Sequence, residues 1–187
     1  MTAISAAQAQ QSAKAPVILI INQAQVLAQS KAGQSIQPQL AKLEEEANKE
    51  LNAEVEKVLK ESEDLKKQKD LMAEDVWLEK AKQVAVKQNN LPVLRDVKVR
   101  ELSLSEQQAL GKISEAMKPI LKEIVENRGA TLLLDRSAVM YASIDTDITQ
   151  EVIAELDKKL KSVEVEKVSL AELQRQAAEA QKAGQKN

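Results

Sequence analysis

The chain lacks the two side chains that most often carry acid–base and metal chemistry near neutral pH. Its 187 residues contain no histidine and no cysteine. The usual general base is therefore missing, together with thiol nucleophiles, disulfides and thiolate ligands. A zinc site would have to be built from carboxylates alone, which is unusual. We therefore expect that the chain is not an enzyme and has no catalytic residue, metal site or cofactor.

Two motifs that could bind a phosphate or a metal ion have simpler structural explanations. Leu110-Gly111-Lys112 lacks the preceding glycine and the following serine or threonine of a phosphate-binding loop. Asp135, Asp145 and Asp147 could be imagined as a metal cluster, but turns and helix caps account for aspartates at such positions. Neither motif indicates a ligand.

Composition favours long helices over a compact core. Trp77 and Tyr141 are the only aromatic residues, whereas charged residues make up 30% of the chain. Aromatic side chains supply much of the area in a compact core, and a chain with few glycines and prolines and much Ala, Leu, Glu and Lys is typically helical. Because the formal net charge is −2, we expect no nucleic-acid partner.

Residues 1–16 are expected to form a flexible, polar N-terminus, and one motif within them allows two interpretations. Ala7-Gln8-Ala9 has the small-x-small form of a signal-peptidase site. The triplet either marks the end of a signal-peptide remnant or occurs by chance in an Ala-rich stretch, since the charged and apolar regions that precede such sites are missing.

Residues 17–35 are predicted to form a strand and a short helix. Residues 17–21 are continuously apolar and rich in β-branched side chains, which favours a strand buried on both faces. Residues 23–30 can form two helical turns, with Gly33 as a C-terminal cap.

Residues 36–128 are predicted to form an antiparallel helical hairpin that projects as an arm. Apolar residues step by threes and fours from Leu40 to Val76, and again from Leu110 to Ile124. Asn89-Asn90-Leu91-Pro92 breaks the pattern, so we place the turn of the hairpin near 88–100. An ascending helix of about 45 residues would reach roughly 65–70 Å, too far to be part of a compact domain.

The chain returns to the body after Gly129. Residues 131–135 and 139–144 are predicted strands around a turn at 136–138, and residues 148–160 a helix, so that the second part of the body covers 129–161. Residues 162–187 are predicted to be a polar tail, weakly helical or disordered. The predicted core of the body, which would be completed by oligomerisation, consists of Val17, Leu19, Ile21, Leu132, Leu134, Val139 and Tyr141.

The predicted fold class is therefore α+β and mostly helical, with a small β body and a long projecting helical hairpin. Three short strands and two small helices would bury little apolar area in one chain. An obligate oligomer is the expected remedy.

The two body segments resemble the Skp (OmpH-like) family of periplasmic chaperones. The first matching piece runs from Val17 to Asn22 and on to Gly33, and the second from Gly129 through Ser143 to Val152. The arm resembles that of the family only in being a long helical segment, without specific matching motifs. The resemblance implies a homotrimer with a central β-barrel, whose three arms enclose a cavity for unfolded outer-membrane β-barrel proteins, held without ATP in the periplasm. It also favours the signal-peptide interpretation of residues 1–9.

The alternative function is a structural or tethering coiled-coil protein of the cell envelope that binds no client. One departure from the family bears on function, because its studied members are strongly basic. The mild acidity of this chain puts lipopolysaccharide binding in question.

Two sets of residues near the predicted arm tip are candidates for contact with a client. Exposed apolar side chains could offer weak, adaptable contacts. A basic stretch with Asp96 as its only acidic residue could meet acidic clients or make weak contact with an anionic membrane surface. We favour the simpler interpretation of a solvated tip for the basic stretch. The apolar set is Leu91, Val93, Leu94, Val97 and Val99, and the basic set is Lys80, Lys82, Lys87, Arg95, Lys98 and Arg100.

Overall fold

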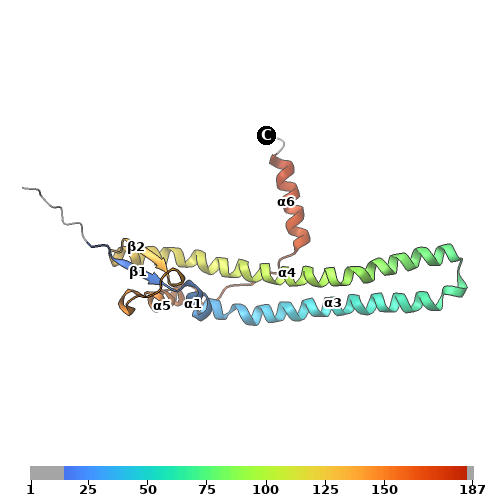
Figure 1. Cartoon of the computed structure of the whole chain (residues 1–187), viewed down its shortest axis with the longest axis horizontal. Coiled ribbons are helices and arrows are strands. Elements are labelled where there is room, and N and C mark those ends of the chain that lie inside the picture. Colours follow the sequence, from blue (N-terminus) through green and yellow to red (C-terminus); the bar gives the residue numbers. More distant parts are fainter. Residues whose placement is uncertain (1–14, 185–187) are drawn as a thin grey trace, which may run out of the picture.

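A computed structural model describes residues 15–184 as a small body from which a long helical hairpin projects (Figure 1). The predicted fold class, mostly helical with a small sheet and a projecting arm, is confirmed. The arm consists of α3 (Ile36–Lys67) and α4 (Glu74–Asn127). The body contains β1 (Ile18–Ile21), α1 (Gln23–Gln29), α2 (Lys31–Gln34), β2 (Leu132–Asp135) and α5 (Thr149–Lys159).

The body is assembled from both ends of the chain, as the sequence predicts. Strands β1 and β2 pair in parallel, with Ile18 opposite Leu132 and Ile21 opposite Asp135. The start of α5 is joined to the same sheet, because the Asn22 backbone N–H donates to Thr149 Oγ1 at 2.9 Å. Segments more than a hundred residues apart in sequence thus form one unit.

The second predicted strand of the body, at 139–144, does not form. The chain leaves β2 through a 3₁₀ turn, η2 (Arg136–Ala138), in which Asp135 Oδ1 accepts hydrogen bonds from the backbone N–H and the hydroxyl of Ser137. This turn does not fold the chain back along β2. Residues 139–143 therefore have no strand partner among residues 15–184, and a second 3₁₀ turn, η3 (Ile144–Thr146), follows them.

The core of the body also includes the last third of α4. Ile113, Met117, Ile120 and Ile124, which the helical spacing predicts as one face, are buried against the strand and against α5. The arm and the body therefore share one helix. The division into a body at 17–35 and 129–161 and an arm at 36–128 stays a prediction.

Helix α4 ends in the glycine cap that the sequence predicts. Gly129 has a φ of 58°, a conformation that glycine adopts without steric cost. Its N–H donates to Glu126 O at 3.1 Å, and the Ala130 N–H donates to Val125 O at 2.9 Å. This pair of bonds is a Schellman motif, which turns the chain sharply into β2.

The turn of the hairpin lies at 68–73, so the predicted turn near 88–100 is wrong. Helix α3 ends at Lys67 after 32 residues, and a short 3₁₀ turn, η1 (Lys69–Leu71), leads into α4. At a rise of 1.5 Å per residue, α3 is about 48 Å long and the 54 residues of α4 span about 81 Å.

The predicted breaker fails because proline can be accommodated on an exposed face of a helix. Pro92 lies inside α4 and is exposed. It removes one backbone hydrogen bond, to the carbonyl of Gln88, which is itself exposed and can bind water. Leu91 before it and Leu94 and Arg95 after it are good helix formers.

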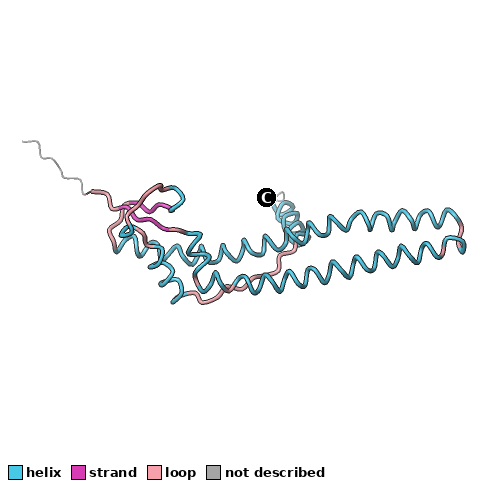
Figure 2. The backbone as a smooth tube through the Cα atoms, turned by 60° about the horizontal axis from the view of Figure 1, so that its bottom comes forward, coloured by secondary structure: helices cyan, strands magenta, loops and turns pink. Residues whose placement is uncertain are grey.

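The predicted polar tail is ordered over most of its length. Residues 161–169, which we call the strap, run in extended form along the base of the arm, and α6 (Leu170–Gly184) then leaves it (Figure 2). Val163, Val165 and Val168 are buried. The expectations for residues 1–9, and for most of 1–16, lie outside the described residues. No helix between residues 15 and 184 has both the length and the apolarity needed to cross a membrane.

Candidate functional site

The arm offers the largest surface for binding, and its packing loosens toward the tip. Near the body, α4 buries six side chains, all between Ser105 and Ile124. From Glu74 to Leu104 the same helix has no fully buried residue. The outer half of the arm therefore buries few side chains, Val58 and Leu65 of α3 among them, and much of its side-chain surface is exposed.

Two grooves run between the arm helices in this outer half. One has a volume of about 480 Å³ and contains Leu91 and Leu94 of α4 facing Glu50 and Glu54 of α3. The second has a volume of about 300 Å³ and lies closer to the tip, between Leu65 and Val84. Both combine aliphatic walls with carboxylate and lysine rims, which suits an extended, mixed-polarity chain better than a compact ligand.

Exposed aliphatic side chains occur as single residues in the outer part of the arm, between residues 59 and 99. Isolated exposed apolar side chains are common on proteins. Here they recur on a thin two-helix arm, where each is accessible from the side. The exposed aliphatic residues of the arm are Leu59, Leu71, Val76, Leu78, Val86, Val93 and Val99.

The arm tip is built around Trp77. Its indole Nε1 donates to the Leu65 carbonyl at 3.1 Å, which fixes the start of α4 against the end of α3. Lys69 Nζ lies 5.3 Å from the centre of the Trp77 ring, within cation–π range. Leu71 is 82% exposed beside them. The tip therefore presents one rigid aromatic anchor and one large exposed aliphatic side chain.

The predicted apolar contact residues do not lie at the tip. Leu91 is 17 residues into α4, about 25 Å from its start. Leu91 and Leu94 line the larger groove, whereas Val93 and Val99 point outward and Val97 is half-buried. The structure thus separates the five residues between two surfaces, and their contact with a client stays a prediction.

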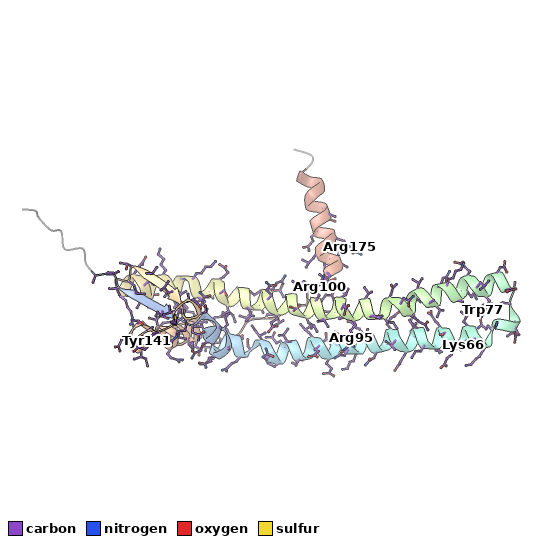
Figure 3. The ribbon with its side chains drawn as sticks, viewed as in Figure 1. Lys66, Trp77, Arg95, Arg100, Tyr141 and Arg175 are labelled. Carbon is purple, nitrogen blue, oxygen red and sulfur yellow. The ribbon has the colours of Figure 1, made fainter. Side chains whose placement is uncertain are left out.

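The predicted basic set does not form a patch. Figure 3 shows Arg95 and Arg100 midway along the arm, far from Trp77 at the tip. Lys87 pairs with Glu61 at 2.6 Å, and Lys98 pairs with Glu50 at 2.7 Å. Lys80 lines the groove nearest the tip, and Lys82 is exposed. Pairing with the acidic α3 neutralises part of the charge, which supports the interpretation of a solvated surface.

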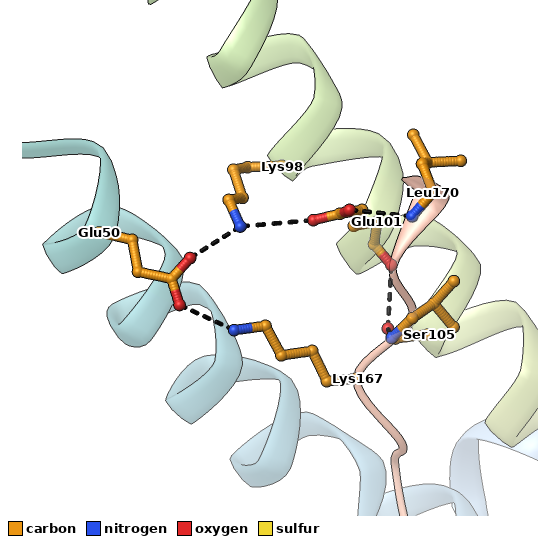
Figure 4. A network of polar contacts seen from close by, with 7 residues as sticks. Glu50, Lys98, Glu101, Ser105, Lys167 and Leu170 are labelled. Carbon is orange, nitrogen blue, oxygen red and sulfur yellow. Dashed lines mark hydrogen bonds and ion pairs between the residues drawn. The ribbon is translucent and has the colours of Figure 1, made fainter. Parts of the chain in front are cut away.

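The densest polar network of the arm surrounds Glu50 (Figure 4). Its carboxylate accepts from Lys167 Nζ of the strap at 2.8 Å and from Lys98 Nζ of α4 at 2.7 Å. Lys98 also lies 3.5 Å from the carboxylate of Glu101. The hydrogen bond from Lys167, followed by that from Lys98, lowers the pKa of Glu50 to about 2. The hydrogen bond with Glu50 in turn raises the pKa of Lys98.

The body exposes an apolar surface beside its small sheet. Tyr141 is 89% exposed, and Met140 and Ile144 are about as accessible. Of the predicted core, Leu19 and Ile21 are buried in the chain itself, Leu134 and Val139 are half-buried, and Val17, Leu132 and Tyr141 are exposed. We call the exposed set the body patch; it consists of Val17, Ile18, Leu132, Met140, Tyr141 and Ile144.

Two features of the arm were missed from the sequence, and each left a signal. The true turn is marked by charge, because Lys66 and Lys67 end α3 and Glu74 and Asp75 begin α4. That arrangement complements both helix dipoles. The strap left a weaker signal, the alternation of valine and glutamate at 163–166. Within residues 15–184 no group of acidic side chains is arranged to hold a metal ion.

Comparisons with known proteins relate the chain to one family. Residues 17–156 match the family model of OmpH-like outer membrane proteins. A solved structure from Caulobacter crescentus CB15, proposed to be an OmpH-like outer membrane chaperone, superposes with a TM-score of 0.71 at 25% sequence identity. The match covers 84% of this chain and 94% of that one. The comparison with curated proteins found no match.

Proposed function

Because the chain belongs to the OmpH-like family, we propose that it is an ATP-independent holdase chaperone for unfolded outer-membrane β-barrel proteins in the periplasm. Such a chaperone must bind many sequences weakly and release them without an energy source. It therefore needs dispersed apolar contacts on an accessible surface more than one deep pocket.

The observation that carries this proposal is the set of single aliphatic side chains exposed along the arm. A packed coiled coil would cover its apolar residues in one seam. Here Leu71, Val93 and Val99 are each more than half exposed and are well separated along the arm. An unfolded chain could contact several of them at once, and each contact would be easily broken.

The body patch supports a homotrimer. A small two-stranded sheet with large apolar side chains exposed beside it is poorly covered in a lone chain. Residues 139–143 are free to pair with a neighbouring copy, which would extend the sheet across subunits. In the proposed assembly the bodies join through this patch and the arms surround a common space.

We propose one further partner, an anionic membrane surface. The lysines of the outer arm could make weak contact with an anionic membrane surface. The arm shows no basic patch that would favour lipopolysaccharide, so we do not extend the proposal to that ligand.

The proposal is tested by diluting a urea-unfolded outer-membrane barrel protein into buffer with and without the chain. We expect light scattering from the aggregating client to fall when the chain is present. The triple variant Leu71→Ser, Val93→Ser and Val99→Ser should lose most of this protection, because each replacement removes an exposed aliphatic contact.

A matched variant carries serine at three exposed alanines of the arm, Ala41, Ala53 and Ala85. It should protect as well as the original chain. If the client aggregates equally with and without the original chain, the protein is better described as a structural or tethering coiled coil of the cell envelope.

A further inference from the structure

The strap occupies a built groove at the base of the arm. Its two sides are the start of α3 and the middle of α4, which approach each other there across the extended chain (Figure 2). Val163, Val165 and Val168 are each less than 10% exposed, whereas the intervening Glu164 and Glu166 are exposed. The groove thus takes up Val163 and Val165, which lie two positions apart as on one face of a strand, and then Val168, three positions further on.

Side chains of the arm bind the backbone of the strap. The Gln39 amide is bidentate, since its Nε2 donates to Val163 O at 2.7 Å and its Oε1 accepts from the Val165 N–H at 3.1 Å. Ser35 Oγ accepts from the Val163 N–H at 3.0 Å. Contacts of this kind recognise an extended backbone and do not depend on which side chains it carries.

The α4 side of the groove continues the same pattern. The buried Ser105 hydroxyl donates to Glu101 O at 2.9 Å and accepts from the Val168 N–H at 3.0 Å. The Glu101 carboxylate accepts from the Leu170 N–H at 2.9 Å (Figure 4). Two charged pairs hold the exposed side of the strap, Lys112 with Glu166 and Lys167 with Glu50.

The strap lies outside the part of the chain that matches the family. The match ends at residue 156, and both walls of the groove lie within it. Both walls of the groove therefore belong to the part of the chain that the family model describes, and the strap lies outside that part. Beyond the strap, α6 stands away from the arm, so displacement of the strap would not require a packed helix to be removed (Figure 1).

From these contacts we infer that the groove is a binding site for extended segments that present apolar residues two positions apart, as Val163 and Val165 of the strap do in cis. The inference rests on the proposed holdase function and specifies the segment bound. Transmembrane strands of barrel proteins carry apolar residues at this two-residue spacing. A client strand would displace the strap and take over its backbone contacts with Gln39 and Ser105.

The test uses the full chain and a dye-labelled peptide with the sequence of residues 161–171. In one variant, Val165→Asp with Val168→Asp releases the strap and leaves the groove unchanged. In a second, Ser105→Cys with Val168→Cys locks the strap by a disulfide, the only one possible because the chain has no other cysteine. Ser105 Oγ lies 3.0 Å from the Val168 nitrogen, so the two positions are adjacent.

We expect the released variant to bind the peptide at least tenfold more tightly than the original chain in fluorescence anisotropy. The locked variant should bind only after reduction. A control with aspartates at two exposed positions, Ser162→Asp and Ala171→Asp, should behave like the original chain. A peptide with aspartate at the three valine positions should not bind the released variant.

Equal binding of the valine and aspartate peptides would overturn the inference, and so would peptide binding to the locked variant that reduction leaves unchanged. If the circular dichroism of the released variant shows that its helices have unfolded, the inference is tested instead by comparing peptide binding to the locked variant before and after reduction. A barrel protein added to the same variants separates the two proposals. Loss of protection in every variant refutes the holdase function, whereas equal protection by the locked and reduced forms refutes only the role of the groove.

Discussion

Glu50 is the residue on which three segments converge. It joins α3 to α4 through Lys98 and to the strap through Lys167. Its side chain is 48% exposed, so solvent screens much of each attraction. The position of the carboxylate between two cations matters more than the strength of either pair, because it links the strap to both arm helices.

This geometry predicts a pH-dependent stability. The folded pKa of Glu50, about 2, lies below its ordinary value of 4.5. The charged form is therefore favoured by folding, and its contribution is complete above pH 4.5 and is lost as the pH falls toward 2. We expect Glu50→Gln to lower the free energy of unfolding by about 1 kcal/mol at pH 7, after allowance for screening. Urea titrations at pH 7, 4 and 2 measure the difference.

Glu45→Gln is the matched control, because Glu45 forms only an exposed pair with Lys49 one turn away. It should change the free energy of unfolding much less. A loss at Glu50 that is as large at pH 2 as at pH 7 would contradict the electrostatic explanation.

At the scale of elements, sequence spacing located the buried face of α4 but neither the buried strap nor the turn of the arm. The face from Ile113 to Ile124 and the cap at Gly129 follow from periodicity and from the conformational freedom of glycine, and both are present. The turn of the arm was misplaced because Pro92 outweighed the charge pattern at 66–75. A proline on a solvated face costs one hydrogen bond, whereas the charges complement two helix ends.

The strap could not be found by the same reasoning. Its three valines pack against residues 35–47 and 98–113, and these contacts between distant parts of the chain have no local periodicity. The alternation over four residues was too short to distinguish from chance. The prediction that Leu91 and its neighbours lie at the tip was wrong for a related reason, because it depended on a turn of the arm near 88–100.

Pro92 provides a prediction at this scale. Its replacement by alanine restores the backbone hydrogen bond to Gln88 and should raise the free energy of unfolding of the arm by about 1–3 kcal/mol. Thermal unfolding followed by circular dichroism measures the change. Pro38→Ala is the control, because Pro38 lies in the first turn of α3, where no such bond is lost. A gain at Pro38 equal to that at Pro92 would contradict this explanation.

In the whole molecule, the body patch exposes large apolar side chains at the end opposite the arm tip, where Tyr141 lies (Figure 3). Burying Met140 and Tyr141 between copies would stabilise an assembly by about 2 kcal/mol for each side chain. We expect the original chain to have a mass of roughly 62 kDa in light scattering, three times its 20.6 kDa. Met140→Ser with Tyr141→Ser should shift it toward the mass of one chain.

Leu71→Ser with Leu78→Ser serves as the control for this prediction. These residues are exposed at the far end of the arm, so their replacement removes apolar surface without touching the body patch. The mass should not change. A single-chain mass for the original protein at micromolar concentration would refute the trimer.

Helix α4 has a mechanical consequence, because one rod of 54 residues runs from the core to the tip. Its body end is clamped by Ile113, Met117 and Ile120, which are buried. The arm therefore cannot swing at its root without distorting the core, and any flexing has to occur along the rod itself. Pro92 is its softest joint, with 18 residues of α4, about 27 Å, as the lever beyond it. In the proposed trimer, that length would limit how widely the arms could spread around clients of different sizes.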